Sequence, residues 1–136
     1  MKAKEKETAK TVFDFTTIKS FEDACKKEGF DPSIVPDVSK IPEEFREAIL
    51  AVYKLFVAYK AINNGIEMDF RDPSFAKYWP WAKVLSSGFV FAGSAYVFDG
   101  AGTAVGSRLC TDSSEKARYM FETFEKEYEK FWLIPE

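Results

Sequence analysis

Two segments of the chain place apolar residues at helical spacing, and both predict helices that pack on a core. The C-terminal segment has an apolar residue every three or four positions, which forms one stripe along a helix, and its charged residues predict a solvated opposite face. The stripe consists of Ala117, Phe121, Phe124, Tyr128 and Phe131. Between residues 45 and 59 apolar residues surround nearly the whole helix. We therefore expect a central helix that is covered on more than one side.

Cap residues predict where these two helices begin and end. Pro42 suits the first position of the central helix, and the Asn-Asn-Gly sequence of residues 63–65 suits its end. For the last helix we expect Asp112 as the N-cap residue and Glu115 at the third helical position. The C-terminal helix should therefore begin directly after Asp112.

A short N-terminal helix is predicted over residues 21–28. Ser20 is its expected N-cap residue, with Asp23 completing a shortened capping box. Gly29 can adopt the left-handed conformation that ends a helix, and Phe30 can then fold back on the helix end.

The segment from residue 77 to residue 112 combines aromatic residues and glycine with few charges, and it predicts the sheet. Three strands are expected, joined by two short turns. They cover residues 78–85, 89–98 and 103–110. Pro80 has no N–H to donate, which places the first strand at an edge. The expected fold class is α+β: a three-stranded antiparallel meander packed against the long central helix and the C-terminal helix, with a short N-terminal helix.

The middle strand is apolar on both of its faces. Simple alternation puts Phe89, Phe91 and Gly93 on one face and Val90 and Tyr96 on the other. Both faces must therefore be covered. The chain's own helices can cover one face or both, and otherwise the second face meets another chain or a ligand.

The length of 136 residues suits one domain with a substantial core. Residues 1–10 are rich in lysine and glutamate and predict a frayed tail, which leaves residues 11–136 as the single α+β domain. The tail lacks the apolar region of a signal peptide, which favours a cytoplasmic protein.

Composition narrows the chemistry, because the chain has no histidine. This removes histidine acid–base catalysis, Ser-His and Cys-His nucleophile pairs and most zinc sites. Cys25 and Cys110 are expected to be buried structural thiols, with a single disulfide between them as the alternative. We predict no metal site and no cofactor.

The charge and the hydropathy of the chain indicate whether nucleic acid or a membrane could be its partner. A formal net charge of −3 and a pI near 5.2 give no global attraction for phosphate backbones or anionic membranes. The longest apolar run, residues 48–59, is interrupted by Lys54 and is shorter than a membrane span. The sequence therefore disfavours nucleic acid and membrane as partners.

Tyr78, Trp79, Trp81 and Lys83 on the first strand are the first candidate binding residues. Alternate strand positions share a face, so Trp79, Trp81 and Lys83 lie together. Aromatic rings beside a cation can stack nucleobases. The same rings can instead belong to the core or anchor a protein interface.

Ser107 and Arg108 are the second candidate group. A hydroxyl, an arginine and the free N–H groups of the last helix fall within a short stretch, and together they can bind a phosphate or carboxylate. The alternative is a structural ion pair of Arg108 with Asp99 or Asp112.

Glu67, Asp69 and Asp72 are close in sequence, in a loop where acidic residues commonly serve turns. Nothing beyond their proximity supports a glycosidase or a divalent-metal site. We therefore predict no catalytic residues and no enzyme.

Seven blocks of sequence are distributed from about Ile18 to Ile134: SFEDACKKEGFDPS, PDVSKIPEEFREAI, YKLFVAYKAINNG, YWPW, SSGF, VGSRLC and YEKFWLI. In these blocks the chain resembles a group of small uncharacterised proteins encoded by phages and prophages of anaerobic gut bacteria. The resemblance implies a mobile-element accessory protein in the cytoplasm of a bacterial host. It implies no activity, cofactor or functional residue.

We therefore expect a small non-enzymatic accessory protein that acts by protein–protein interaction or by self-association. The alternative is a protein that binds nucleotides or single-stranded nucleic acid through the aromatic first strand and an anion site at Arg108.

Overall fold

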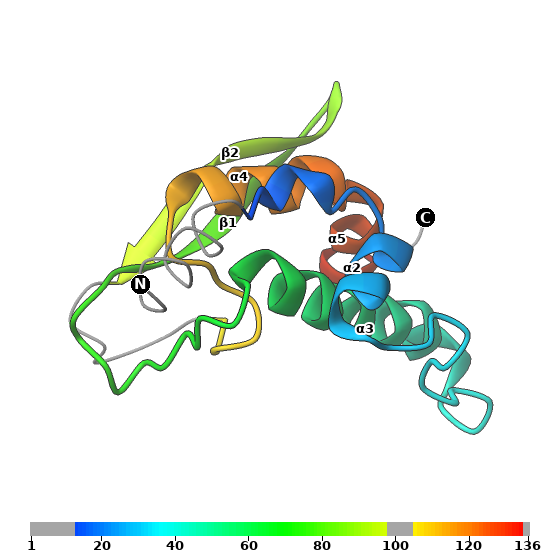
Figure 1. Cartoon of the computed structure of the whole chain (residues 1–136). Helices are drawn as coiled ribbons and strands as arrows, with labels where there is room; N and C mark the ends of the chain where they lie inside the picture. Colours follow the sequence, from blue (N-terminus) through cyan, green and yellow to red (C-terminus); the bar gives the residue numbers. More distant parts are fainter. Residues whose placement is uncertain (1–12, 98–104, 135–136) are drawn as a thin grey trace.

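The computed structural model describes residues 13–97 and 105–134, so the predicted tail, Phe98 and residues 103–104 lie outside it. The fold is α+β, as predicted, and its sheet has two antiparallel strands in the described residues (Figure 1). The elements are a 3-10 turn η1 (Phe15–Thr17), helices α2 (Phe21–Glu28) and α3 (Glu43–Asn63), strands β1 (Lys77–Leu85) and β2 (Gly88–Val97), and helices α4 (Ser114–Thr123) and α5 (Glu125–Trp132).

The three-stranded meander is wrong. Residues 105–110 form turns and no strand. Gly106 adopts a left-handed conformation with φ of 76°, which interrupts an extended chain. Among the described residues Thr111 alone bridges the other edge of β1, through two hydrogen bonds of 2.8 Å with the backbone of Tyr78.

Pro80 fits its strand because of the alternation of hydrogen bonds. The N–H and C=O of Tyr78 both bond to Thr111, so these groups point away from β2. Pro80 lies two residues further along β1, where the missing N–H also faces away from β2. No ladder bond is lost, and β1 is an edge strand in the described two-stranded sheet, as predicted.

A β-bulge divides the hairpin. Trp81 pairs with Gly93, and the next residue, Ala82, pairs with Phe91, so Ala92 is an extra residue in β2. The predicted alternation along β2 is therefore wrong across this point, because the bulge shifts every later side chain to the opposite face.

The inner face of the hairpin packs on α4. The rings of Phe89 and Phe91 lie 5.2 Å and 5.9 Å from the ring of Phe121, measured between centroids. Figure 1 shows α4 crossing one side of the sheet, no described helix on the other side, and the hairpin tip projecting past the helices. The helices therefore cover one face of the sheet.

The predicted caps of α2 are present. The hydroxyl of Ser20 accepts a hydrogen bond of 3.1 Å from the N–H of Asp23. At the other end Gly29 is left-handed, with φ of 75°, and the N–H of Phe30 donates to the carbonyl of Cys25 at 2.9 Å. These local signals placed α2 correctly.

Helix α3 begins one residue later than predicted, with Pro42 as the N-cap position, and ends at the left-handed Asn64. At the start of α4 the N-cap is Ser113 instead of Asp112. Ser113 has the extended backbone of an N-cap, and its hydroxyl accepts from the N–H of Lys116 at 3.2 Å. Asp112 instead binds the ammonium of Lys116 at 2.8 Å.

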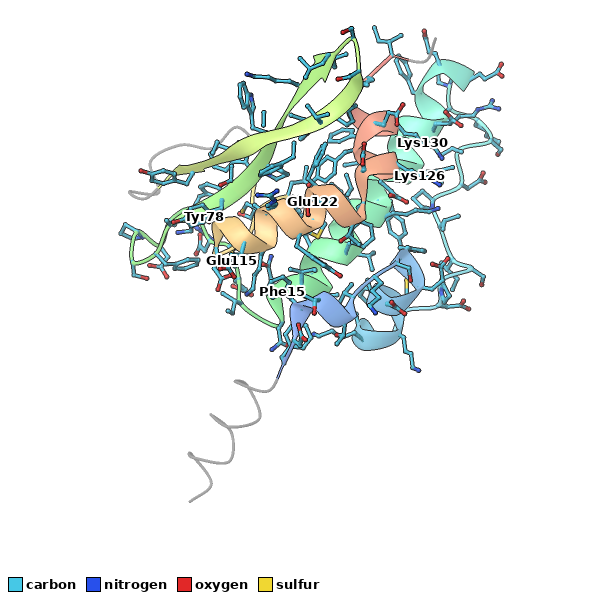
Figure 2. All side chains as sticks on the ribbon, turned by 90° about the horizontal axis from the view of Figure 1, so that it is seen from above. Phe15, Tyr78, Glu115, Glu122, Lys126 and Lys130 are labelled. Atoms are coloured by element: carbon cyan, nitrogen blue, oxygen red, sulfur yellow. The ribbon has the colours of Figure 1, made fainter. Side chains whose placement is uncertain are left out.

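The predicted C-terminal helix is two helices that meet at Phe124, whose φ of −112° and ψ of 32° interrupt the helical geometry. The stripe is buried as predicted, with Phe131 partly buried. The break lets α4 face the sheet while α5 packs against α3. Glu122, Lys126 and Lys130, which are labelled in Figure 2, are exposed and do not belong to the buried stripe.

The centre of the core joins α3 to α5 through a hydrogen bond between the hydroxyls of Tyr59 and Tyr128. Both side chains are buried among apolar residues of α2, α3, α4 and α5. Burial raises the pKa of each hydroxyl well above its ordinary value.

Candidate functional site

The side of the hairpin that faces away from α4 is called the outer face here. By strand register, its exposed and partly exposed side chains in the described residues are those of Trp79, Trp81, Lys83, Leu85, Val90 and Ala95, whereas Lys77 at the base of β1 is fully buried. Trp81 exposes 53% of its surface, Leu85 50% and Val90 36%. The ammonium of Lys83 lies 5.5 Å from the centroid of the Trp81 ring. The outer face is therefore an open apolar surface with one cation on it.

Tyr78 does not belong to this surface. Its side chain alternates to the other side of β1, where its ring lies 5.5 Å from the ring of Tyr96. Figure 2 labels Tyr78 at the end of the sheet where α4 begins. The candidate residues of the first strand are thus divided between two faces.

The loop before β1 buries Lys77, which the sequence analysis did not single out. Its ammonium donates to the carbonyl of Asp72 and lies 4.1 Å from the ring centroid of Phe75. The ring of Phe70 is 5.9 Å away. A lysine at the strand start, two residues after Phe75 and next to Tyr78, is the only sequence signal for this arrangement, which closes the loop over the base of the hairpin.

The clustered carboxylates hold turns. Asp69 accepts hydrogen bonds from the N–H and the guanidinium of Arg71, at 2.9 Å and 3.0 Å, and these bonds lower the pKa of Asp69. Hydrogen bonds from Ser74 likewise lower the pKa of Asp72. Within the described ranges, no group of three histidine, cysteine, aspartate or glutamate residues could hold a metal ion.

Ser107 and Arg108 lie apart from the tryptophans and line a cavity of about 700 Å³. The other walls come from the C-terminal half of α3, the loop of residues 65–71 and Phe30. Asp112, one predicted partner of Arg108, binds Lys116 instead, and the other, Asp99, lies outside the described residues.

Asn63 is a buried polar residue in the wall of this cavity, and the sequence analysis did not identify it as functional. It is 6% exposed, and its Nδ2 donates to the carbonyl of Cys110 at 2.9 Å. Its Oδ1 is buried and has no hydrogen-bond partner in the described structure. As part of an Asn-Asn-Gly helix end, Asn63 gave no signal beyond that of a cap residue.

Both cysteines are buried free thiols, so the alternative of a Cys25–Cys110 disulfide is not formed. Burial raises the pKa of Cys110 to about 12 and also raises the pKa of Cys25. Thiols held protonated in this way are poor nucleophiles and poor metal ligands.

Comparisons of the chain with protein-family models, curated proteins and solved structures found no match. Across residues 13–97 and 105–134, no helix combines the length and the apolar character needed to cross a bilayer. The outer face and the cavity are therefore the two candidate sites of the described residues.

Proposed function

We propose that the protein is a non-enzymatic accessory protein of phage type that associates with a second copy of itself through the outer face. The observation that supports this proposal is the exposure of Trp81, Leu85 and Val90 together on one side of a two-stranded sheet. Tryptophan is enriched among the residues that anchor protein interfaces.

The stability of the hairpin supports the same proposal. A two-stranded hairpin is marginal in water unless something packs on it. Helix α4 covers the inner face, whereas the tip extends past it and leaves Val84 67% exposed. A second sheet packed against the outer face would remove Trp81, Leu85 and Val90 from water and would support the tip.

Charge favours a second copy as the occupant. Lys83 is the one charged residue of the six on the outer face, so two copies related by a two-fold axis would bring few like charges together. Strand β2 has no charged residue, and it lacks the edge lysines that keep strands of different molecules apart. A nucleic acid would find a single cation on this face.

The non-enzymatic part of the proposal rests on the absence of histidine and on the carboxylates. Asp69 and Asp72 are engaged by the backbone of their own turns. Their lowered pKa values suit ionised hydrogen-bond acceptors and oppose a role as general acid.

Sedimentation velocity over a wide concentration range tests the self-association. We expect the wild type to form dimers, and Trp81→Ala and Val90→Lys to shift the protein to monomer. Ser87→Lys is the matched control, because it adds the same charge at the exposed turn outside the outer face. Circular dichroism of each variant confirms that it is folded.

A wild type that stays monomeric at every concentration would refute self-association. The salt dependence distinguishes self-association from nucleic-acid binding, because an apolar contact depends little on ionic strength. Single-stranded oligonucleotide binding that falls steeply with salt and weakens in Trp81→Ala would instead support the nucleic-acid function.

A further inference from the structure

The cavity beside α3 is independent of the outer face, because none of its lining residues belongs to β1 or β2. In Figure 1 the gold segment before α4 lies beside the C-terminal end of α3, and this juxtaposition forms one wall. The volume of about 700 Å³ is typical of small-molecule sites, which span about 300–1,000 Å³.

One part of the wall is apolar and open. Tyr53, Phe56, Ile66 and Met68 all line the cavity. Phe56 and Ile66 are among the exposed large apolar side chains of the molecule, although each sits in a concave surface. Such a wall suits a planar or aliphatic body that removes these side chains from water.

The buried carboxamide of Asn63 requires a donor. A buried acceptor without a hydrogen bond is destabilising, because it has lost its bonds to water, and Oδ1 of Asn63 is such an acceptor. A ligand N–H or O–H would satisfy it. A single water molecule could serve this one atom, but it would leave the apolar wall and the nearby cations without a counterpart.

The polar rim is cationic. Three basic residues line the cavity, Lys60, Arg71 and Arg108, together with the acidic residues Glu67 and Asp69. Arg71 is paired with Asp69 at 3.0 Å. In the described part of the chain, neither Lys60 nor Arg108 has an acidic partner. Two cations are therefore available for an anionic group.

We propose that this cavity binds a small organic oxyanion, a carboxylate or a phosphate, that carries an apolar ring and one N–H or O–H donor. The ring lies along Tyr53 and Phe56, the donor meets Oδ1 of Asn63, and the oxyanion lies at Lys60 and Arg108. The ring matches the exposed apolar side chains, the donor matches the unpaired Oδ1, and the oxyanion matches the two cations that have no acidic partner in the described residues.

Four indole compounds test the proposal in titrations followed by amide NMR shifts and calorimetry. Indole-3-acetate and 3-indoxyl phosphate carry the ring, the N–H and one of the two oxyanions. 1-Methylindole-3-acetate lacks the donor, and indole-3-acetamide lacks the charge. We expect saturable binding of at least one of the two full probes, with shifts at Lys60, Asn63 and Ile66. The analogue without donor and the analogue without charge should each bind about tenfold more weakly.

Charge variants provide the second test. Arg108→Gln and Lys60→Gln change exposed residues and should leave the fold intact, while each weakens the anionic probe about tenfold. Arg118→Gln is the matched control, because Arg118 pairs with Glu122 on α4 and does not line the cavity.

Three results would overturn the site. They are the absence of saturable binding by both indole oxyanions, an affinity that Arg108→Gln and Lys60→Gln both leave unchanged, and shifts confined to the outer face. If both oxyanions bind, their relative affinity identifies whether the carboxylate or the phosphate is preferred.

Discussion

Cys110 links the burial of one side chain to the pH dependence of folding. Its pKa is raised to about 12, so the folded protein holds this proton more tightly than the unfolded chain does. The resulting stability is fully present below about pH 9 and is lost as the pH rises toward about 12. We expect the melting temperature to fall across this window.

The control for this prediction is Cys110→Ala, which removes the titrating group. The fall in melting temperature above about pH 9 should be shallower in the variant. The pKa of Cys25 is also raised by burial, so part of the fall in melting temperature remains in the variant. Parallel curves for the wild type and the variant would contradict the assignment.

Phe124 is buried at the junction between α4 and α5, and its replacement leaves a cavity. We predict that Phe124→Ala lowers the free energy of unfolding by about 3–5 kcal/mol, measured by urea denaturation. Phe45→Ala is the matched control, because Phe45 is 52% exposed on α3. Equal losses in the two variants would show that the stripe is not the core contact described above.

At the start of α4 the contribution of the cap can be compared with that of the partly buried ion pair between Asp112 and Lys116. Ser113→Ala removes the hydroxyl that accepts from Lys116 and should cost about 1 kcal/mol. Asp112→Ala removes the ion pair with the same lysine and should cost about 0.5 kcal/mol. Chemical denaturation of both variants measures which of them loses more stability. A larger loss for Asp112→Ala would restore Asp112 as the capping residue.

Elements specified by neighbouring residues could be predicted, and those specified by distant pairing could not. Ser20 and Gly29 mark α2 because each bonds within its own helix end. The bulge at Ala92 and the lone bridge of Thr111 depend on which strand lies opposite, which no short window of sequence contains. Asp112 and Ser113 are adjacent and both suit an N-cap, so residue type alone could not show which of them caps α4.

The same distinction applies to the candidate sites. Strand periodicity suffices to group Trp79, Trp81 and Lys83. The cavity depends on Asn63 and Cys110, which are 47 residues apart and meet only in the folded chain. The charge of Arg108 indicates an anion site in the sequence, yet the residues that share its cavity come from α3 and the loop after it.

Over the whole molecule, protection against amide hydrogen exchange should follow packing. We expect the slowest exchange in α3, where Leu55, Ala58 and Ile62 are fully buried. The hairpin tip around Val84 should exchange fastest among the strand residues, because no described helix supports it. Native-state exchange at low protein concentration measures both. A tip as protected as α3 would contradict this order.

The hydrogen-bonded pair of Tyr59 and Tyr128 gives the protein an optical marker of its own. An exposed tyrosine ionises near about pH 10, whereas this pair keeps its protons while the chain is folded. At a pH below these raised pKa values, phenolate absorbance from the two residues therefore follows the separation of α5 from α3. In an alkaline jump, the slow part of the absorbance rise would report the opening of the core without any added dye or label.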